Sequence, residues 1–234
     1  MKCFTTPLLT ALLISMFIAL AAHAADDAKS KDKKDEKSAL TIDKEKKTIR
    51  IDCKIAPRKL PNLDDIYPIE VIACWSHPRG QKAHETIVTH TINPSEVHKA
   101  LESLGLKAGK PAKGADAVAQ GPELKIYIEL PGPADTVKKV PIERTLIDRK
   151  TGKTMPSVKW HFTGSIKKKL DPTKDEEVYA ADHTGTIIGI FPVTDETVIQ
   201  SSLTMKEEPF IKMETNKNVL PAEGTQVTLI IEVK

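Results

Sequence analysis

The sequence predicts a β-rich α+β domain, with a mostly antiparallel sheet and one well-defined helix at residues 94–104. Short apolar or alternating runs recur along the chain, and its 16 prolines fall mostly between them. This is typical of short strands joined by firm turns. Because strong helical signals are confined to one stretch, we expect that helix to pack on one face or end of the sheet.

The helix has clear start and stop signals. Asn93 is a good N-cap, and Pro94 fits the first helical position, where its missing N–H costs nothing. Glu96 completes a capping-box pattern. Gly105 can adopt the left-handed conformation that ends a helix. The spacing of one apolar stripe then follows the helical period, at Val97, Ala100, Leu101 and Leu104.

The strands are predicted from β-branched and alternating runs. Residues 48–55 and 124–130 alternate apolar and polar side chains, as in a strand with one buried face. Residues 67–75 are apolar almost throughout, which favours burial on both faces. The remaining strands are expected within residues 84–92, 137–148, 158–162, 178–181, 186–191 and 226–233.

The N-terminus has the pattern of a secretory signal. Lys2 precedes an apolar run at residues 8–21, and Ala22 and Ala24 are the small residues that a signal peptidase accepts. The run is short for a membrane span, which takes about 20 residues. We therefore expect a signal peptide at residues 1–24, no transmembrane anchor after its cleavage, and a periplasmic or secreted protein. The alternative is an uncleaved anchor helix.

Residues 25–40 are mostly charged or small, and cannot bury enough apolar area to offset the entropy of ordering. We expect a disordered tether there, followed by a single domain at residues 41–234. Loss of Lys2 with the signal would lower the net charge from +3 to +2. With so little net charge and few aromatic residues, no nucleic-acid partner is expected.

Two cysteines follow the expected cleavage site, Cys53 and Cys74. An even number of cysteines in an exported chain favours a disulfide. The two residues lie on neighbouring predicted strands, so a bridge between them is geometrically reasonable. The alternative is a pair of buried free thiols.

Four segments resemble a known family. ACWSHPRGQKAHETIV is followed by PSEVHKALESLGLKAGKP, with IYPIEVIAC upstream and WHFTGS downstream. Together they resemble the YdjY domain family of exported bacterial proteins, over residues 48–234. The resemblance implies an exported domain but no catalytic residues, since the family has no agreed active site.

The histidines form no metal-binding motif. The chain contains neither an HExxH sequence nor paired CxxC sequences, and no metal or other cofactor is expected. On a strand, His84 and Glu85 would point to opposite faces, which argues against their acting on one substrate. The potential metal ligands are instead dispersed, at His77, His84, Glu85, His90, His98, His161 and His183.

The loop at residues 76–84 is the most interesting predicted surface. Loops on rigid scaffolds often carry recognition, and the basic side chains of this loop suit an anionic ligand or another envelope component. An ordinary solvated loop is the alternative. The candidate ligand-binding residues are His77, Arg79, Lys82, His84 and Glu85.

We therefore expect a non-catalytic binding or structural protein of the cell envelope. The alternative function is a metal-dependent or histidine-based hydrolase centred on residues 82–86 (KAHET), using His77, His84 and Glu85.

Overall fold

The computed structural model describes residues 38–234 apart from residue 210. The expected signal peptide and residues 25–37 of the expected tether lie outside this range. The last tether residues belong to the folded domain. The Asp52 N–H donates to the Ala39 carbonyl oxygen at 2.8 Å, and Leu40 begins the first strand.

The domain consists mainly of strands. They are β1 (Leu40–Asp43), β2 (Thr48–Ile55), β3 (Val71–Trp75), β4 (Thr86–His90), β5 (Glu123–Pro131), β6 (Val137–Pro141), β7 (Leu146–Asp148), β8 (Trp160–Phe162), β9 (Lys167–Lys169), β10 (Glu177–Tyr179), β11 (Ile188–Gly189), β12 (Ile199–Ser201), β13 (Met213–Thr215) and β14 (Gln226–Val233). The helical segments are α1 (Pro94–Ser103), α2 (Ala181–Thr184) and single 3-10 turns at Ala83–Glu85, Pro133–Asp135 and Ile142–Thr145.

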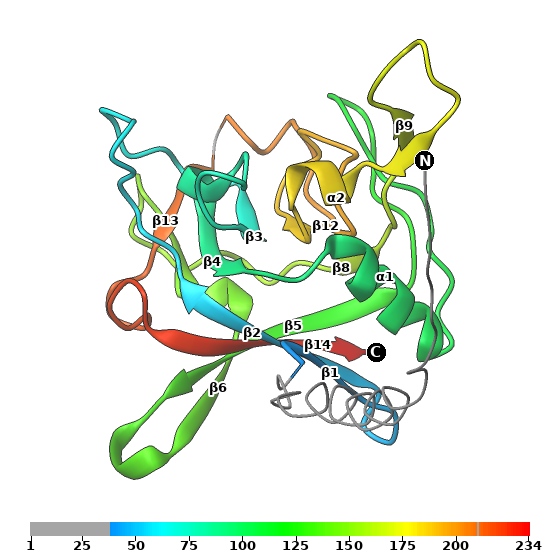
Figure 1. The fold of residues 1–234 in the computed structure, drawn as a ribbon. Helices are drawn as coiled ribbons and strands as arrows, with labels where there is room; N and C mark the ends of the chain where they lie inside the picture. Colours follow the sequence, from blue (N-terminus) through cyan, green and yellow to red (C-terminus); the bar gives the residue numbers. More distant parts are fainter. Residues whose placement is uncertain (1–37, 210) are drawn as a thin grey trace, which may run out of the picture. The chain divides into compact units, whose positions relative to one another are not determined.

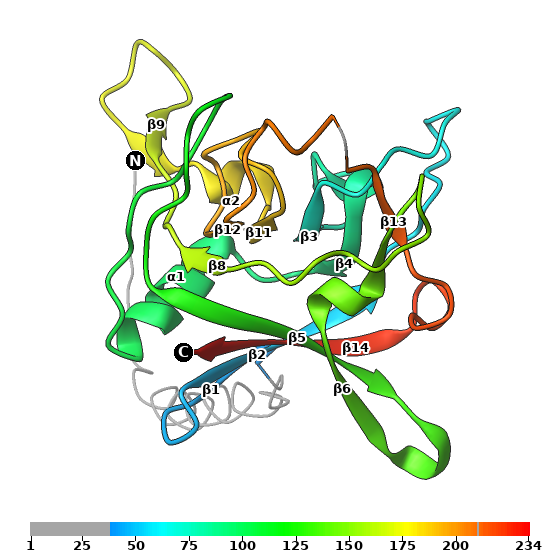
Figure 2. The same ribbon diagram turned by 180° about the vertical axis from the view of Figure 1, so that it is seen from behind.

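Eight of the strands form a closed barrel (Figures 1 and 2). Their order is β2-β14-β5-β8-β12-β11-β3-β4, and β4 pairs with β2 to close the ring. The pairs β3–β4 and β11–β12 are parallel, and the other pairs in the ring are antiparallel. The prediction of a β-rich, mostly antiparallel sheet is confirmed, but the sheet is a closed, mixed barrel.

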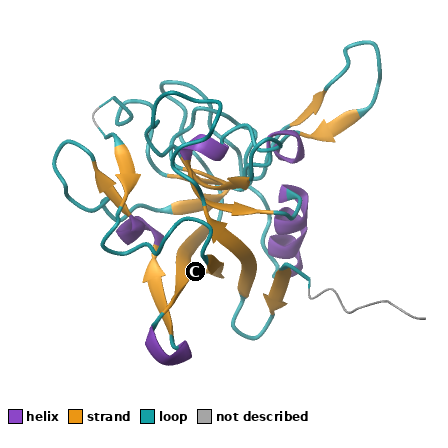
Figure 3. Ribbon diagram, turned by 60° about the vertical axis from the view of Figure 1, so that its left-hand side comes forward, coloured by secondary structure: helices purple, strands orange, loops and turns teal. Residues whose placement is uncertain are grey.

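Two strands extend the barrel sheet beyond the ring. β1 pairs with β2, and β6 pairs with β5 to make a long hairpin. This hairpin and the separate β9–β10 hairpin project from the barrel (Figures 1 and 3).

Helix α1 confirms its prediction to within one residue. The Asn93 N–H donates to Glu96 Oε1 at 2.9 Å, as the capping-box pattern requires. Val97, Ala100 and Leu101 are buried in the core of the domain. Among the described residues, no helix is long and apolar enough to cross a membrane.

Long strands with clear alternation were predicted well, and short ones poorly. Both residues 48–55 and residues 226–233 are strands over their full predicted length. The predicted strand at residues 84–92 is wrong at its start, because Ala83–Glu85 form a 3-10 turn and β4 begins at Thr86. The strands missed from sequence have only three or four residues each, too few to show a period: β1, β9, β12 and β13.

The expected disulfide is absent from the structure, in which Cys53 and Cys74 are free, buried thiols. Cys53 lies on β2 and Cys74 on β3, and β4 lies between these strands. Two strand spacings amount to about 9–10 Å, whereas bridged Cα atoms are usually no more than about 6.8 Å apart. Burial also raises the pKa of Cys53 to about 12, so its reactive thiolate is disfavoured.

Both thiols should therefore be present in the purified protein. We expect Cys53 and Cys74 each to react with a thiol reagent in denaturant without reductant, as located by mass spectrometry of the peptides. In the absence of denaturant both should be protected, because they are buried. A mass two daltons lower for the peptide pair, with no labelling, would show the bridge instead.

The helix packing gives a second prediction. Leu101 is fully buried, whereas Lys99 on the same helix is exposed. Leu101→Ala should lower the free energy of unfolding by about 2–5 kcal/mol, and the matched Lys99→Ala by less than about 0.5 kcal/mol. Urea denaturation of both variants checks this, and equal losses would contradict the observed packing of α1.

Candidate functional site

A groove opens beside β5, where the two strands on one of its edges diverge. β8 pairs with Glu123 and Leu124 at the start of β5. β6 pairs with residues 127–131 at its other end. Lys125 and Ile126 therefore have no strand partner on this edge.

The register determines which peptide groups point into this gap. On the far edge of β5, the Lys234 N–H donates to the Glu123 carbonyl oxygen at 3.3 Å. Because hydrogen-bonding direction alternates along a strand, the odd-numbered residues of β5 face β14. On the edge that faces β8, the Phe162 N–H donates to the Pro122 carbonyl oxygen at 2.9 Å, so the even-numbered residues face β8 and β6. Ile126 therefore faces the edge shared by β8 and β6. Because Pro141 has no N–H, its pairing with Tyr127 requires the Ile142 N–H to donate to the Ile126 carbonyl oxygen. The Ile126 N–H is left facing the gap between β8 and β6.

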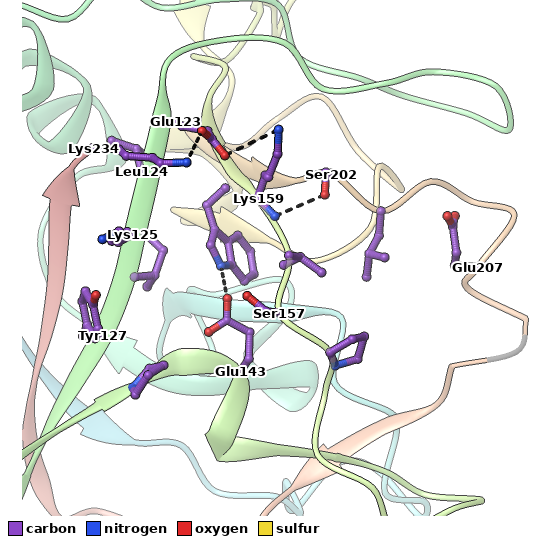
Figure 4. A pocket seen from close by; sticks show the side chains of 16 residues that line it. Glu123, Leu124, Lys125, Tyr127, Glu143, Ser157, Lys159, Ser202, Glu207 and Lys234 are labelled. Atoms are coloured by element: carbon purple, nitrogen blue, oxygen red, sulfur yellow. Dashed lines mark hydrogen bonds and ion pairs between the residues drawn. The ribbon is translucent and has the colours of Figure 1, made fainter.

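The gap is part of a groove with a volume of about 750 Å³ (Figure 4). This is within the usual range for small-molecule sites, roughly 300–1,000 Å³. β5, β8 and three loops supply its walls. The lining residues are Glu123, Leu124, Lys125, Ile126, Tyr127, Pro141, Glu143, Pro156, Ser157, Val158, Lys159, Trp160, Ser202, Leu203, Glu207 and Lys234.

Trp160 and Glu143 form the centre of the groove. The Trp160 side chain is almost fully buried, and its Nε1–H donates to Glu143 Oε1 at 2.8 Å. This bond fixes the carboxylate on the 3-10 turn that follows β6 (Figure 4). Trp160 and Phe162 are both core residues, and the indole N–H of Trp160 reaches the groove.

The three carboxylates of the groove have different partners. Glu123 Oε2 lies 2.6 Å from Lys234 Nζ, and this bond lowers the pKa of Glu123. Glu207 Oε2 accepts the Thr204 N–H at 2.9 Å. Glu143 makes no ion pair with any described residue, so its charge is unmatched within this part of the chain.

The residues at positions 76–86 have a different arrangement from the one expected. Gly80 packs against the Trp75 backbone, where an added Cβ would lie 1.8 Å from the Trp75 carbonyl oxygen. The loop then turns through Ala83–Glu85 as a 3-10 helix. His84 Nε2 and Glu85 Oε1 are 3.0 Å apart. Their expected placement on opposite faces of a strand is wrong, because they belong to a turn.

Lys82 joins two carboxylates beneath this turn. Its Nζ lies 2.6 Å from Glu85 Oε2 and 3.1 Å from Glu70 Oε2. Burial raises the pKa of Glu70, the Glu85 charge raises it further, and Lys82 opposes both effects. Burial alone would lower the pKa of Lys82, but its bonds to the two carboxylates outweigh burial and raise it. The charge of Lys82 is therefore compensated within the protein.

The other two candidate residues lie apart from this cluster. The Arg79 guanidinium is 3.2 Å from the centroid of the Trp75 ring, a cation–π contact, and Nη2 donates to Asn93 Oδ1 at 3.4 Å. His77 is exposed in the loop after β3. The five residues proposed from sequence thus form no single cationic surface. Only Lys82, His84 and Glu85 come together.

Arg58 anchors this turn and was not foreseen. Its Nη1 donates to the His84 carbonyl oxygen at 3.0 Å, and its Nη2 donates to the Tyr67 carbonyl oxygen. It joins the loop before β3 to the loop before β4. Backbone carbonyl acceptors carry no side-chain signature, so no sequence motif could have indicated this contact.

The histidines of the described region are dispersed. Within residues 38–234, residue 210 excluded, no group of three or more His, Cys, Asp or Glu side chains is arranged to hold a metal ion. His90 is buried, with Nε2 3.1 Å from the Gly185 carbonyl oxygen and Nδ1 3.2 Å from that of Ile92. The net effect on the pKa of His90 is a decrease to about 4. Burial is the main cause, the bonds to the two carbonyl oxygens oppose it, and the nearby charge of Arg79 adds to it.

The fold and groove define the protein as a closed β-barrel domain with a lateral groove. A model of the YdjY domain matches residues 40–232, most of the chain. The chain therefore belongs to the YdjY domain family, as its four segments indicated. No curated protein and no solved structure matches it.

His90 makes the stability of the domain depend on pH. A pKa lowered from 6.5 to about 4 means that the unfolded chain binds more protons between these values. The contribution of neutral His90 to the stability of the folded state is complete above pH 6.5 and is lost as the pH falls towards 4. The loss should approach about 3 kcal/mol.

Urea denaturation at pH 7.0 and 4.5 tests this expectation, with His90→Gln as the matched variant, because glutamine can donate to Gly185 but does not titrate. Between pH 7.0 and 4.5, the free energy of unfolding of the wild type should fall by about 2–3 kcal/mol more than that of the variant. The same loss in both proteins would show that other groups cause the acid sensitivity.

Proposed function

We propose that this protein is an exported, non-catalytic binding module of the cell envelope, with the groove beside β5 as its ligand site. One observation carries the proposal: a groove of about 750 Å³ contains a main-chain N–H, that of Ile126, that the barrel leaves without a strand partner. Buried main-chain N–H and C=O groups are nearly always paired. Such a group in an open groove is available to a ligand.

The location follows from the N-terminal sequence. Residues 1–24 have the pattern of a cleavable signal peptide. The protein would therefore act in the periplasm or outside the cell, with the charged residues 25–37 between the cleavage site and the domain.

The groove chemistry favours binding over catalysis. Its lining contains neither histidine nor cysteine, so it has no Ser–His or Cys–His pair of the kind that forms an activated nucleophile. Glu123 and Glu207 are held by Lys234 and Thr204. The remaining polar groups can orient a ligand without acting on it.

A hydrolase centred on residues 82–86 is the second candidate. The 3.0 Å approach of His84 Nε2 to Glu85 Oε1 favours it, because a carboxylate can orient an imidazole for proton transfer. Against it, Glu85 is also bonded to Lys82. Neither His84 nor Glu85 lines the groove or the smaller cavities beside residues 55–58 and 226–228.

Ligand mapping by NMR separates the two candidates. The ¹⁵N-labelled protein would be screened with separate pools of amino acids, oligopeptides, oligosaccharides and nucleotides. We expect one class to shift the amide signals of residues 124–127 and the indole signal of Trp160. Shifts confined to residues 70 and 82–86 would contradict the proposal and support the second candidate.

A pair of matched variants provides the control. Ser157 and Ser76 are both exposed serines, but only Ser157 lines the groove. Ser157→Trp should fill the groove and weaken binding at least tenfold, whereas Ser76→Trp should leave binding unchanged. Equal effects of the two substitutions would show that the ligand binds elsewhere.

A further inference from the structure

We infer that the groove takes a short, extended peptide with a basic side chain, whose main-chain carbonyl oxygen accepts the Ile126 N–H and whose cation pairs with Glu143. This inference rests on the proposed function of the groove and names its ligand class. Three features of the groove support it: an open main-chain N–H, a carboxylate without an ion pair, and little available aromatic surface.

The open edge is the first feature. β8 covers the edge of β5 up to Leu124, and β6 covers it from residue 127. Between them Ile126 presents one N–H in strand geometry, since its carbonyl oxygen accepts the Ile142 N–H. An extended peptide offers a complementary main-chain carbonyl oxygen, as in recognition of a peptide at a sheet edge. The length of the gap limits this contact to one residue, so the ligand is short.

The unmatched carboxylate is the second feature. Glu143 Oε1 is held by the indole of Trp160 at 2.8 Å, and no described cation forms an ion pair with this side chain. Three lysines line the groove, and none of them pairs with Glu143: Lys159 and Lys234 pair with Glu123, and Lys125 forms no ion pair with a described residue. A fixed acidic group without an ion-pair partner favours an ammonium or guanidinium group of the ligand.

The aromatic residues are the third feature, and they disfavour an oligosaccharide. Sugar rings generally pack on exposed aromatic faces. The Trp160 side chain is only 1% exposed, and one face of the Tyr127 ring is covered by Lys139 Nζ, 4.1 Å from the ring centroid. The groove therefore offers mainly hydrogen bonds and charge.

The test uses defined peptides. One panel consists of N-acetylated, C-amidated tripeptides with lysine in the centre and alanine, valine or leucine on both sides. The second panel replaces lysine with norleucine, which keeps the methylenes but has no charge. Each peptide is titrated into the ¹⁵N-labelled protein, and affinity is measured from the signals of Ile126 and Trp160.

We expect at least one lysine peptide to shift the Ile126 amide and to bind about tenfold more tightly than its norleucine counterpart, as a charge-assisted hydrogen bond allows. Glu143→Gln should remove this difference, because glutamine keeps an acceptor for Trp160 but has no charge. An unchanged indole signal of Trp160 in the free variant would show that the groove is intact.

Equal affinities of the two panels, or no shift at Ile126 with any lysine peptide, would overturn the inference. If an oligosaccharide then shifts the groove signals, the ligand class is wrong but the proposed function stands. If no pool shifts those signals, the proposed function fails as well.

Discussion

Closure of the barrel forces two long strands each to share one edge between two neighbours. On β2, β1 pairs with residues 48–51 and β4 with residues 54 and 55. At the change on β2, the Asp52 N–H donates to the Ala39 carbonyl oxygen at 2.8 Å and Cys53 pairs with β14. At the change on β5, the Ile126 carbonyl oxygen accepts the Ile142 N–H, but the Ile126 N–H faces the gap between β8 and β6. The same way of closing the barrel thus leaves an open main-chain donor on β5.

The sequence predicts the elements of this barrel far better than their neighbours. Alternation in residues 48–55 and 226–233, and the capped stripe of residues 94–104, depend on local burial, which periodicity records directly. Alternation says which face of a strand is buried, not which strand lies beside it. The disulfide expected between Cys53 and Cys74 failed for this reason, since β4 enters between their strands.

The local nature of sequence patterns also determined which candidate site was predicted. Residues 76–86 are contiguous and rich in polar side chains, so sequence reasoning found them, but Ala83–Glu85 form a 3-10 turn instead of part of a strand. That turn brings His84 to Glu85 but also allows Lys82 to neutralise the carboxylate. The groove draws on segments of β5, β8 and the chain near residue 202, which are distant in sequence. No local pattern marks Glu143 or Ile126, because their significance lies in the partners that they lack.

The proposed contacts also limit how tightly the groove can bind. A neutral hydrogen bond adds about 0.5–1.5 kcal/mol net, and one to a charged group about 1.5–3 kcal/mol. Association costs at least about 4 kcal/mol in lost translation and rotation. One hydrogen bond from the Ile126 N–H and one charged contact with Glu143 together reach this cost only at the upper end of these ranges, so burial of apolar groups of the ligand must supply the rest. Main-chain pairing does not depend on the ligand side chain, whereas Glu143 selects a cation. Such a site binds many peptides weakly, with one basic residue as the shared requirement.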